Sequence, residues 1–495
     1  MSRKYNVLSC DIGASSGRMV LIGLEDNKLL FDVVHKFKNG PICINESIFW
    51  DIVNIYGEIK KGLVEAKNHD VVIDSFGIDT WGNDFALIDK KGNMMENPFC
   101  YRDARTENMI EYVSGIIDSN ALYMRNGVQL ARFNTLYQLA SLAKDRPYVF
   151  DNANKLLFIP DLLCYFLTGK VVNEYTLSTI SEMYSYAKGD WDFELLAKLK
   201  IPGRIFSKPV MPCMSIGYIS QSVCHELNIR SISITAVPAH DTASAVVSVP
   251  HENEQVAYIS SGTWSILGTE VFSPIINVKG LKYNFSNEGG IQNRIRLSKN
   301  IMGLWIIQEI QRSFETAGKK YSYAEMECMA RRSDKFIAYV GPDDKIFYEP
   351  GKMPEKIVEY CKRSNQKVPK TDGEIIRVIM EGLAMKYRYC LEQLEDLVER
   401  KFDALYIIGG GSKDSLLCEL TAGCCNRPVY AGPSEATALG NAMAQFISLG
   451  AVADVDEARK LIRQNYPPII YFPVEASGWE QYFTNFVNVV EKSGQ

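Results

Sequence analysis

Two distant stretches of the chain share one pattern, and they decide the fold. The stretch LSCDIGASSGRMVLIGLEDN (residues 8–27) joins two strand-forming segments through a turn of small residues, and AYISSGTWSILGTEVFS (257–273) does the same. Small turn residues let backbone N–H groups and hydroxyls approach phosphate oxygens as an anion nest. The stretches therefore predict two phosphate-binding β-hairpins, and two such hairpins facing across a cleft can hold one nucleoside triphosphate. Either stretch alone is also compatible with an ordinary hairpin.

The length and the charge of the chain limit its organisation and its partners. With 495 residues it exceeds what one hydrophobic core usually covers, so we expect two lobes. The net charge of −5, with Lys and Arg scattered among acids, provides no basic face, which argues against nucleic acid as a partner. The sequence contains no uninterrupted run of 18 apolar residues, so it predicts no membrane span, and no export signal is recognisable at the start.

The cysteines point to a reducing compartment. The twelve cysteines are dispersed, mostly in apolar stretches, and none form a CxxC pair. The chain has only five His, so the sequence contains no complete set of zinc ligands. We therefore expect reduced, buried thiols in a cytoplasmic protein.

Strand-like and helical segments alternate along the chain, which predicts an α/β fold. Apolar residues at helical spacing predict one of the helices over 52–66. A strand near residue 234 leads through Pro238 and Ala239 to a helix of small residues over 242–247. We place the lobe boundary just after it, giving an N-terminal lobe over 1–249 and a C-terminal lobe over 250–495. A second small-residue helix is expected over 435–442; such helices can pack backbone to backbone, either as a static pair or as a hinge.

A glycine turn in the second half is a further candidate for nucleotide binding. The apolar strand expected over 404–408 ends in Gly409-Gly410-Gly411-Ser412, and a helix should open after this turn. No GxxxxGK[ST] motif is present, and the run after Gly409 lacks the last glycine of GxGxxG. Because both common nucleotide motifs are absent, the paired hairpins are the better candidate for phosphate binding.

Phosphoryl transfer needs a divalent cation and a base. Asp11 and Asp79 each end a predicted strand, where carboxylates can hold Mg²⁺ through water, although a lone Asp at such a place is more often a turn former. Asp241 lies at a strand-to-helix junction between His240 and Thr242, so we expect it to accept the proton of the acceptor hydroxyl. A role as helix N-cap is the alternative for Asp241.

Several stretches carry a resemblance to a known family. They include DIGASSGR (11–18), GIDTWGNDFALID (77–89), HDTASAV (240–246), SSGTWS (260–265), FSNEGG (285–290), RIRLSKNIMGLWIIQE (294–309) and GGGS (409–412). In these the chain resembles the sugar kinases of the FGGY type, within the actin, Hsp70 and hexokinase superfamily. The resemblance implies two ribonuclease-H-like lobes with the active-site cleft between domains, the N-terminal lobe binding the sugar and carrying the base, and the C-terminal lobe binding ATP.

The resemblance also assigns site residues and cofactors, ATP and Mg²⁺. Residues implied to contact ATP are Ala14, Ser15, Ser16, Gly17, Arg18, Thr263, Gln308 and Gly410. Residues implied to hold the sugar are Gly82, His240, Asp241, Thr242 and Asn300, with Asp241 as the base. From the residues alone, Asn300 would be interpreted as a helix N-cap and Gln308 as the solvent side of that helix.

The expected reaction is phosphorylation of a ketose at its C1 hydroxyl. L-rhamnulose is the expected acceptor, with L-fuculose or D-xylulose as runners-up, and an actin-like or Hsp70-like ATPase is the rival from another class. The sequence predicts no oligomeric state. One departure from the family is Pro238-Ala239 before His240, where the family usually has a Gly that permits positive φ.

Overall fold

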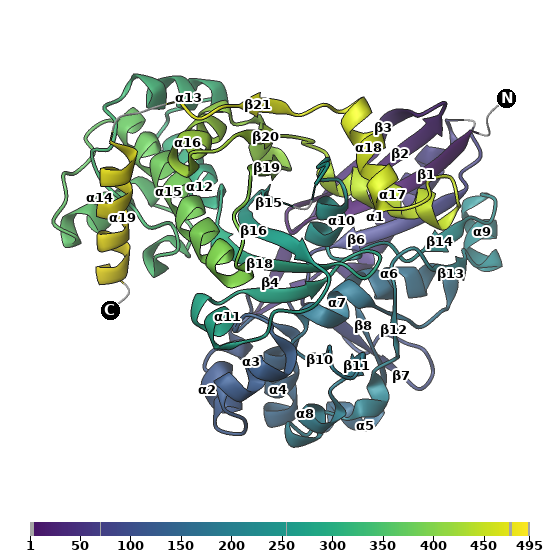
Figure 1. Cartoon of the computed structure of the whole chain (residues 1–495). Coiled ribbons are helices and arrows are strands. Elements are labelled where there is room, and N and C mark those ends of the chain that lie inside the picture. The colour runs from purple at the N-terminus through teal and green to yellow at the C-terminus, as the bar shows by residue number, and fades with distance from the viewer. Residues whose placement is uncertain (1–3, 70, 254, 475–477, 494–495) are drawn as a thin grey trace. The chain divides into compact units, whose positions relative to one another are not determined.

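The computed structural model describes residues 4–69, 71–253, 255–474 and 478–493, and it shows an α/β chain in two compact units (Figure 1). Unit 1 comprises Met1–Pro250, Glu270–Leu297 and Ala436–Asn465; unit 2 comprises His251–Thr269, Ser298–Glu435 and Tyr466–Gln495. The first crossing between units therefore falls beside the expected boundary at residue 249. Two later segments return to unit 1, so the units are not two consecutive parts of the chain.

Unit 1 is built on a six-stranded sheet with the order β13-β14-β6-β1-β2-β3. Strands β1 and β2 form the first hairpin, and β6 pairs with β1 in parallel. The elements that this section and the site use are β1 (Tyr5–Ile12), β2 (Ser16–Glu25), β3 (Lys28–Lys38), β5 (Ser47–Trp50), α1 (Ile52–Lys67), β6 (Ser75–Thr80), β7 (Phe85–Asp89), α4 (Thr135–Asp145), α7 (Tyr175–Ile180), β13 (Ser215–Tyr218), β14 (Ser233–Thr235), α10 (Asp241–Val247), β17 (Ser286–Gly289), α17 (Ala436–Ser448) and α18 (Val455–Asn465).

The sequence pattern explains why the centre of this sheet is buried. β6 is buried along its whole length, and α1 covers the sheet with an apolar stripe that includes Ile55, Ile59 and Leu63. The Asp51 side chain caps α1 by accepting from Asn54 N, which satisfies one of the free amides at the helix start. The helix expected from residue 52 is thus confirmed.

The two helices of small residues, α10 and α17, pack against each other within unit 1. A Cβ added at Gly440 would lie 1.7 Å from the Ser244 carbonyl oxygen, so only glycine allows this approach. The close-packed pair is the arrangement found; a hinge role stays a prediction.

Unit 2 contains the second hairpin, β15 (Val256–Ser261) and β16 (Trp264–Val271). Its strands follow the order β16-β15-β19-β20-β21, and β18 (Ile295–Met302), which starts in unit 1, lies beside β16. The remaining elements named below are α12 (Trp305–Thr316), α15 (Asp372–Val398), β19 (Ala404–Ile408), the 3₁₀ turn η4 (Gly410–Lys413), α16 (Ser415–Cys425), β20 (Val429–Ala431) and β21 (Ile469–Tyr471).

Two properties of the described residues bear on the expectations from composition. No described helix combines the length and apolar character needed to cross a lipid bilayer. All twelve cysteines have free thiols, and most are buried, as in an apolar core.

Candidate active site

The tip of the first hairpin presents the residues expected to contact ATP phosphates. Gly13 N donates to Ser16 O at 2.9 Å to close the turn, and Ser15 and Ser16 are exposed there. A Cβ on Gly17 would lie 2.1 Å from the Phe37 ring, so this position needs glycine. The tip therefore leaves backbone and hydroxyl groups open to an anion.

Arg18 and Asp11 lie opposite each other in the register of this hairpin. Arg18 donates to Asp11 Oδ2 through Nε at 3.1 Å and through Nη2 at 2.8 Å. Arg18 therefore pairs with an acid in this structure, and its contact with ATP stays a prediction.

Asp11 and Asp79 are aligned on neighbouring parallel strands, and they form the candidate metal site. Asp79 is fully buried; Asn441 Nδ2 donates to its Oδ2 at 2.5 Å, whereas its Oδ1 has no hydrogen bond within the described chain. Burial, and then the charge of Asp11, raise the pKa of Asp79 well above its ordinary value. Two like charges and an unpaired carboxylate oxygen fit a divalent cation held through water. No cluster of three or more potential metal ligands occurs among the described residues.

Asp241 is the first residue of α10, with its side chain 34% exposed. Its Oδ1 accepts from Thr242 N at 2.5 Å and from Thr242 Oγ1 at 3.1 Å. The helix cap itself is His240, so Asp241 is not the N-cap considered above. Desolvation of the carboxylate, and then the nearby charge of Asp11, raise the pKa of Asp241 to about 6. The carboxylate is therefore ionised at neutral pH and more basic than an ordinary Asp.

His240 is held beside Asp241 and Gly82. Its backbone N donates to Thr176 Oγ1 at 3.1 Å, and its Nε2 lies 3.5 Å from Asp241 Oδ1. A Cβ on Gly82 would lie 2.4 Å from Ile180 Cδ1 and 3.3 Å from the His240 ring, so glycine keeps this space open. Four of the residues expected at the sugar (Gly82, His240, Asp241 and Thr242) thus come together within unit 1.

A buried carboxylate fixes the turn that carries Gly82. Asp84 is 1% exposed and accepts hydrogen bonds from four donors, and burial raises its pKa to about 6. The donors are Trp50 Nε1 (2.6 Å), Trp81 Nε1 (2.9 Å), Tyr101 N (3.2 Å) and Gln138 Nε2 (2.9 Å). Trp81 is buried, and its ring centroid lies 4.0 Å from that of Trp50 with the ring planes tilted by 36°.

The other expected residues lie in unit 2. Thr263 is in the turn of the second hairpin, where Trp305 N donates to its carbonyl oxygen at 3.1 Å. Gln308 is a half-buried residue of α12. Gly410 is exposed at the start of η4, so the glycine turn leads first into a 3₁₀ turn, and α16 begins only at Ser415. Asn300 lies within strand β18, so its interpretation as a helix N-cap is wrong.

The departure at Pro238-Ala239 does not disturb the strand-to-helix turn. Neither residue is among those with positive φ, and the Ala239 carbonyl oxygen accepts from Thr80 N at 2.9 Å. This bond places the start of α10 at the end of β6. The glycine of the family is therefore not required here.

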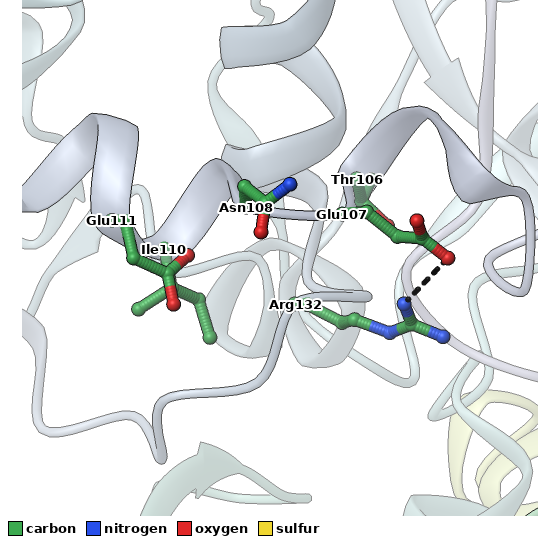
Figure 2. A pocket seen from close by; sticks show the side chains of 6 residues that line it. All are labelled: Thr106, Glu107, Asn108, Ile110, Glu111 and Arg132. Carbon is green, nitrogen blue, oxygen red and sulfur yellow. Dashed lines mark ion pairs between the residues drawn. The ribbon is translucent and has the colours of Figure 1, made fainter.

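Four polar residues that support the site were not predicted from the sequence: Asp84, Glu288, Arg296 and Asn441. Arg296 is fully buried and contacts His240; its signal in the sequence is a charge between the apolar residues Ile295 and Leu297. A hollow of about 220 Å³ near the start of α2 (Met109–Ser114), with the Glu107–Arg132 ion pair at 3.5 Å, contains none of the expected residues (Figure 2).

Comparison with known proteins identifies the family of the chain. The profile of the N-terminal domain of the FGGY family of carbohydrate kinases matches residues 6–248, and that of the C-terminal domain matches 257–449. The chain belongs to the FGGY family of carbohydrate kinases, enzymes that use ATP.

More particularly, it is similar to proteins named rhamnulokinase. That of Oceanobacillus iheyensis is 39% identical and covers 95% of this chain and 99% of its own length. That of Bacteroides thetaiotaomicron is 37% identical and covers 98% of this chain and 100% of its own.

Solved structures share the fold at low identity. A gluconate kinase from Lactobacillus acidophilus has a TM-score of 0.83 at 18% identity, with 99% of this chain and 98% of that chain covered. Plasmodium falciparum glycerol kinase with ADP has a TM-score of 0.81 at 16% identity, with the same coverage. The expected two-domain α/β fold of the family is thereby confirmed.

Proposed function

We propose that the chain phosphorylates L-rhamnulose at its C1 hydroxyl with ATP, giving L-rhamnulose 1-phosphate and ADP, in cytoplasmic degradation of L-rhamnose. The observation that carries this proposal is the grouping of Asp241, His240, Thr242 and Gly82 in one unit of a chain similar over its length to rhamnulokinases. A basic carboxylate beside hydrogen-bonding groups is suited to binding and deprotonating a polyol.

Asp241 would accept the C1 hydroxyl proton as the C1 oxygen attacks the γ-phosphorus. The O–H bond breaks, a P–O bond to C1 forms, and the bond between the γ-phosphorus and the leaving ADP oxygen breaks. A base with a pKa of about 6 is ionised at pH 7 and binds a proton more strongly than an ordinary Asp. His240, Thr242, Gly82 and Asn300 would orient the sugar hydroxyls.

The ATP-binding role is assigned to small and polar residues of the two hairpins and the glycine turn. The residues proposed for it are Ala14, Ser15, Ser16, Gly17, Arg18, Thr263, Gln308 and Gly410. In this assignment unit 1 carries five of the eight proposed nucleotide residues and unit 2 carries three. Unit 1 also carries the base and every proposed sugar residue except Asn300.

Asp11 and Asp79 would hold Mg²⁺ through water. When bound, the ion neutralises negative charge on the phosphates. The Arg18 guanidinium pairs with Asp11 in this structure, and it could turn to bind a phosphate oxygen instead.

The test is sugar-dependent ADP formation with ATP and Mg²⁺ across L-rhamnulose, L-fuculose, D-xylulose, L-ribulose and glycerol. The proposal expects the highest kcat/KM with L-rhamnulose. A preference for L-fuculose or D-xylulose would change the substrate but keep the chemistry. ATP hydrolysis indifferent to every sugar would favour the actin-like or Hsp70-like alternative.

A further inference from the structure

A fully buried arginine contacts the ring of His240. Arg296 Nη2 lies 3.3 Å from His240 Nδ1 and 2.9 Å from Glu288 Oε2, and Arg296 Nε donates to Gly289 O at 3.1 Å. The guanidinium is thus fixed by a carboxylate and a carbonyl oxygen, and one of its nitrogens faces the histidine.

This contact determines which ring nitrogen of His240 carries the proton. A guanidinium has only donors, so Nδ1 must accept and cannot be protonated. A neutral imidazole then has its hydrogen on Nε2. Burial, and then the positive charge of Arg296, lower the pKa of His240 well below its ordinary value, which agrees with a neutral ring.

The Nε2 atom lies where the proposed sugar-binding residues meet. It is 3.5 Å from Asp241 Oδ1 and 3.4 Å from where a Cβ on Gly82 would be. A histidine with Nε2–H and an occupied Nδ1 can donate a hydrogen bond there but cannot take a proton.

We propose that Arg296 is a positioning residue that holds His240 as the neutral Nε2–H tautomer, so that His240 donates a hydrogen bond to a sugar hydroxyl oxygen and Asp241 alone accepts the proton. The part about the sugar rests on the proposed function; the tautomer does not. Without Arg296, the Glu288 carboxylate would remain close to the ring, because its Oε2 is 4.0 Å from Nδ1, and it would attract a proton to Nδ1.

The tautomer can be measured on the full chain without substrate. Long-range ¹H–¹⁵N spectra of histidine-labelled protein at pH 7 resolve the ring nitrogens, and the chain has only five His, so His240→Gln identifies the signals. We expect a bare Nδ1 and a protonated Nε2. A protonated Nδ1 or an imidazolium in the wild-type chain would overturn the proposal, whatever sugar the enzyme uses.

Two variants test the cause. Arg296→Met should shift His240 to the Nδ1–H form or to imidazolium, and should raise KM for the preferred ketose about tenfold with KM for ATP unchanged. An unchanged tautomer would overturn the role of Arg296. The double variant Glu288→Gln with Arg296→Met, which leaves no buried carboxylate without its partner, should lose the fixed Nε2–H form and show the same rise in KM; if it keeps both the tautomer and the KM, the role of Arg296 is likewise overturned.

Arg459 provides the matched control. It is equally buried in unit 1 but pairs with Glu270 and the Val246 carbonyl oxygen, not with His240. Arg459→Met should lower stability and leave the tautomer and the sugar KM as they are. A tautomer change in this variant as large as in Arg296→Met would show a general packing effect and contradict the proposal.

Discussion

Asn441 donates a hydrogen bond to Asp79 at 2.5 Å, although the two residues are 362 positions apart. Gln445, one turn further along α17, donates to Asn441 Oδ1 at 2.7 Å and to Leu8 O at 3.0 Å. A helix from the C-terminal part of the sequence, α17, thus supplies the donor that the buried carboxylate needs. This contact keeps a candidate metal ligand oriented in the core.

Asn441→Ala should therefore lower the free energy of unfolding by about 1–3 kcal/mol, because it leaves Asp79 without its donor. Urea unfolding measures this. In the Asp79→Leu background the same change should cost much less, since no carboxylate remains to be satisfied. Equal costs in both backgrounds would mean that the pair is not coupled.

Gly440→Ala should destabilise the chain by about 1–3 kcal/mol, because the new methyl group meets the Ser244 carbonyl oxygen and forces α10 and α17 apart. Gly57→Ala is the matched control: Gly57 is also helical, and a Cβ there meets nothing within 4 Å. We expect that control to stabilise the chain by about 0.5–1 kcal/mol. Equal thermal shifts for both variants would contradict the packing argument.

Asp84→Asn should cost about 1–3 kcal/mol of stability, because the amide nitrogen that replaces one carboxylate oxygen cannot accept from the donors of that oxygen. The sugar KM should also rise, since the Trp81–Gly82 turn loses its anchor. Asp89→Asn, at the half-buried end of β7, is the control for a nearby loss of charge. A variant at Asp84 with unchanged sugar KM would separate this network from substrate binding.

The pH profile of kcat/KM should show an acid limb near pH 6. Only the ionised Asp241 accepts a proton, and its pKa is raised to about 6, so activity falls about tenfold per pH unit below that value. Asp84 has a pKa raised to the same value, so Asp84→Asn tells the two apart. The limb should persist in that variant; its loss would assign the titration to Asp84.

The hairpins, the helix from residue 52 and the small-residue helices could be predicted because periodicity and turn residues are local signals. Asp241 could be proposed from its place between a strand and a helix. Arg296, Glu288 and Asn441 could not, since their roles depend on contacts between segments far apart in sequence. Asn300 was misplaced because an Asn before an apolar helix resembles a cap, whereas here β18 continues through it.

The most direct test of the account compares Asp241→Asn with the wild-type chain in ADP formation from ATP, Mg²⁺ and L-rhamnulose, with ATP affinity measured separately. Asn keeps the size of the side chain but cannot accept the proton. The account predicts a loss of kcat by orders of magnitude with ATP affinity little changed. Retention of wild-type kcat in the variant would contradict the role of Asp241 as the base.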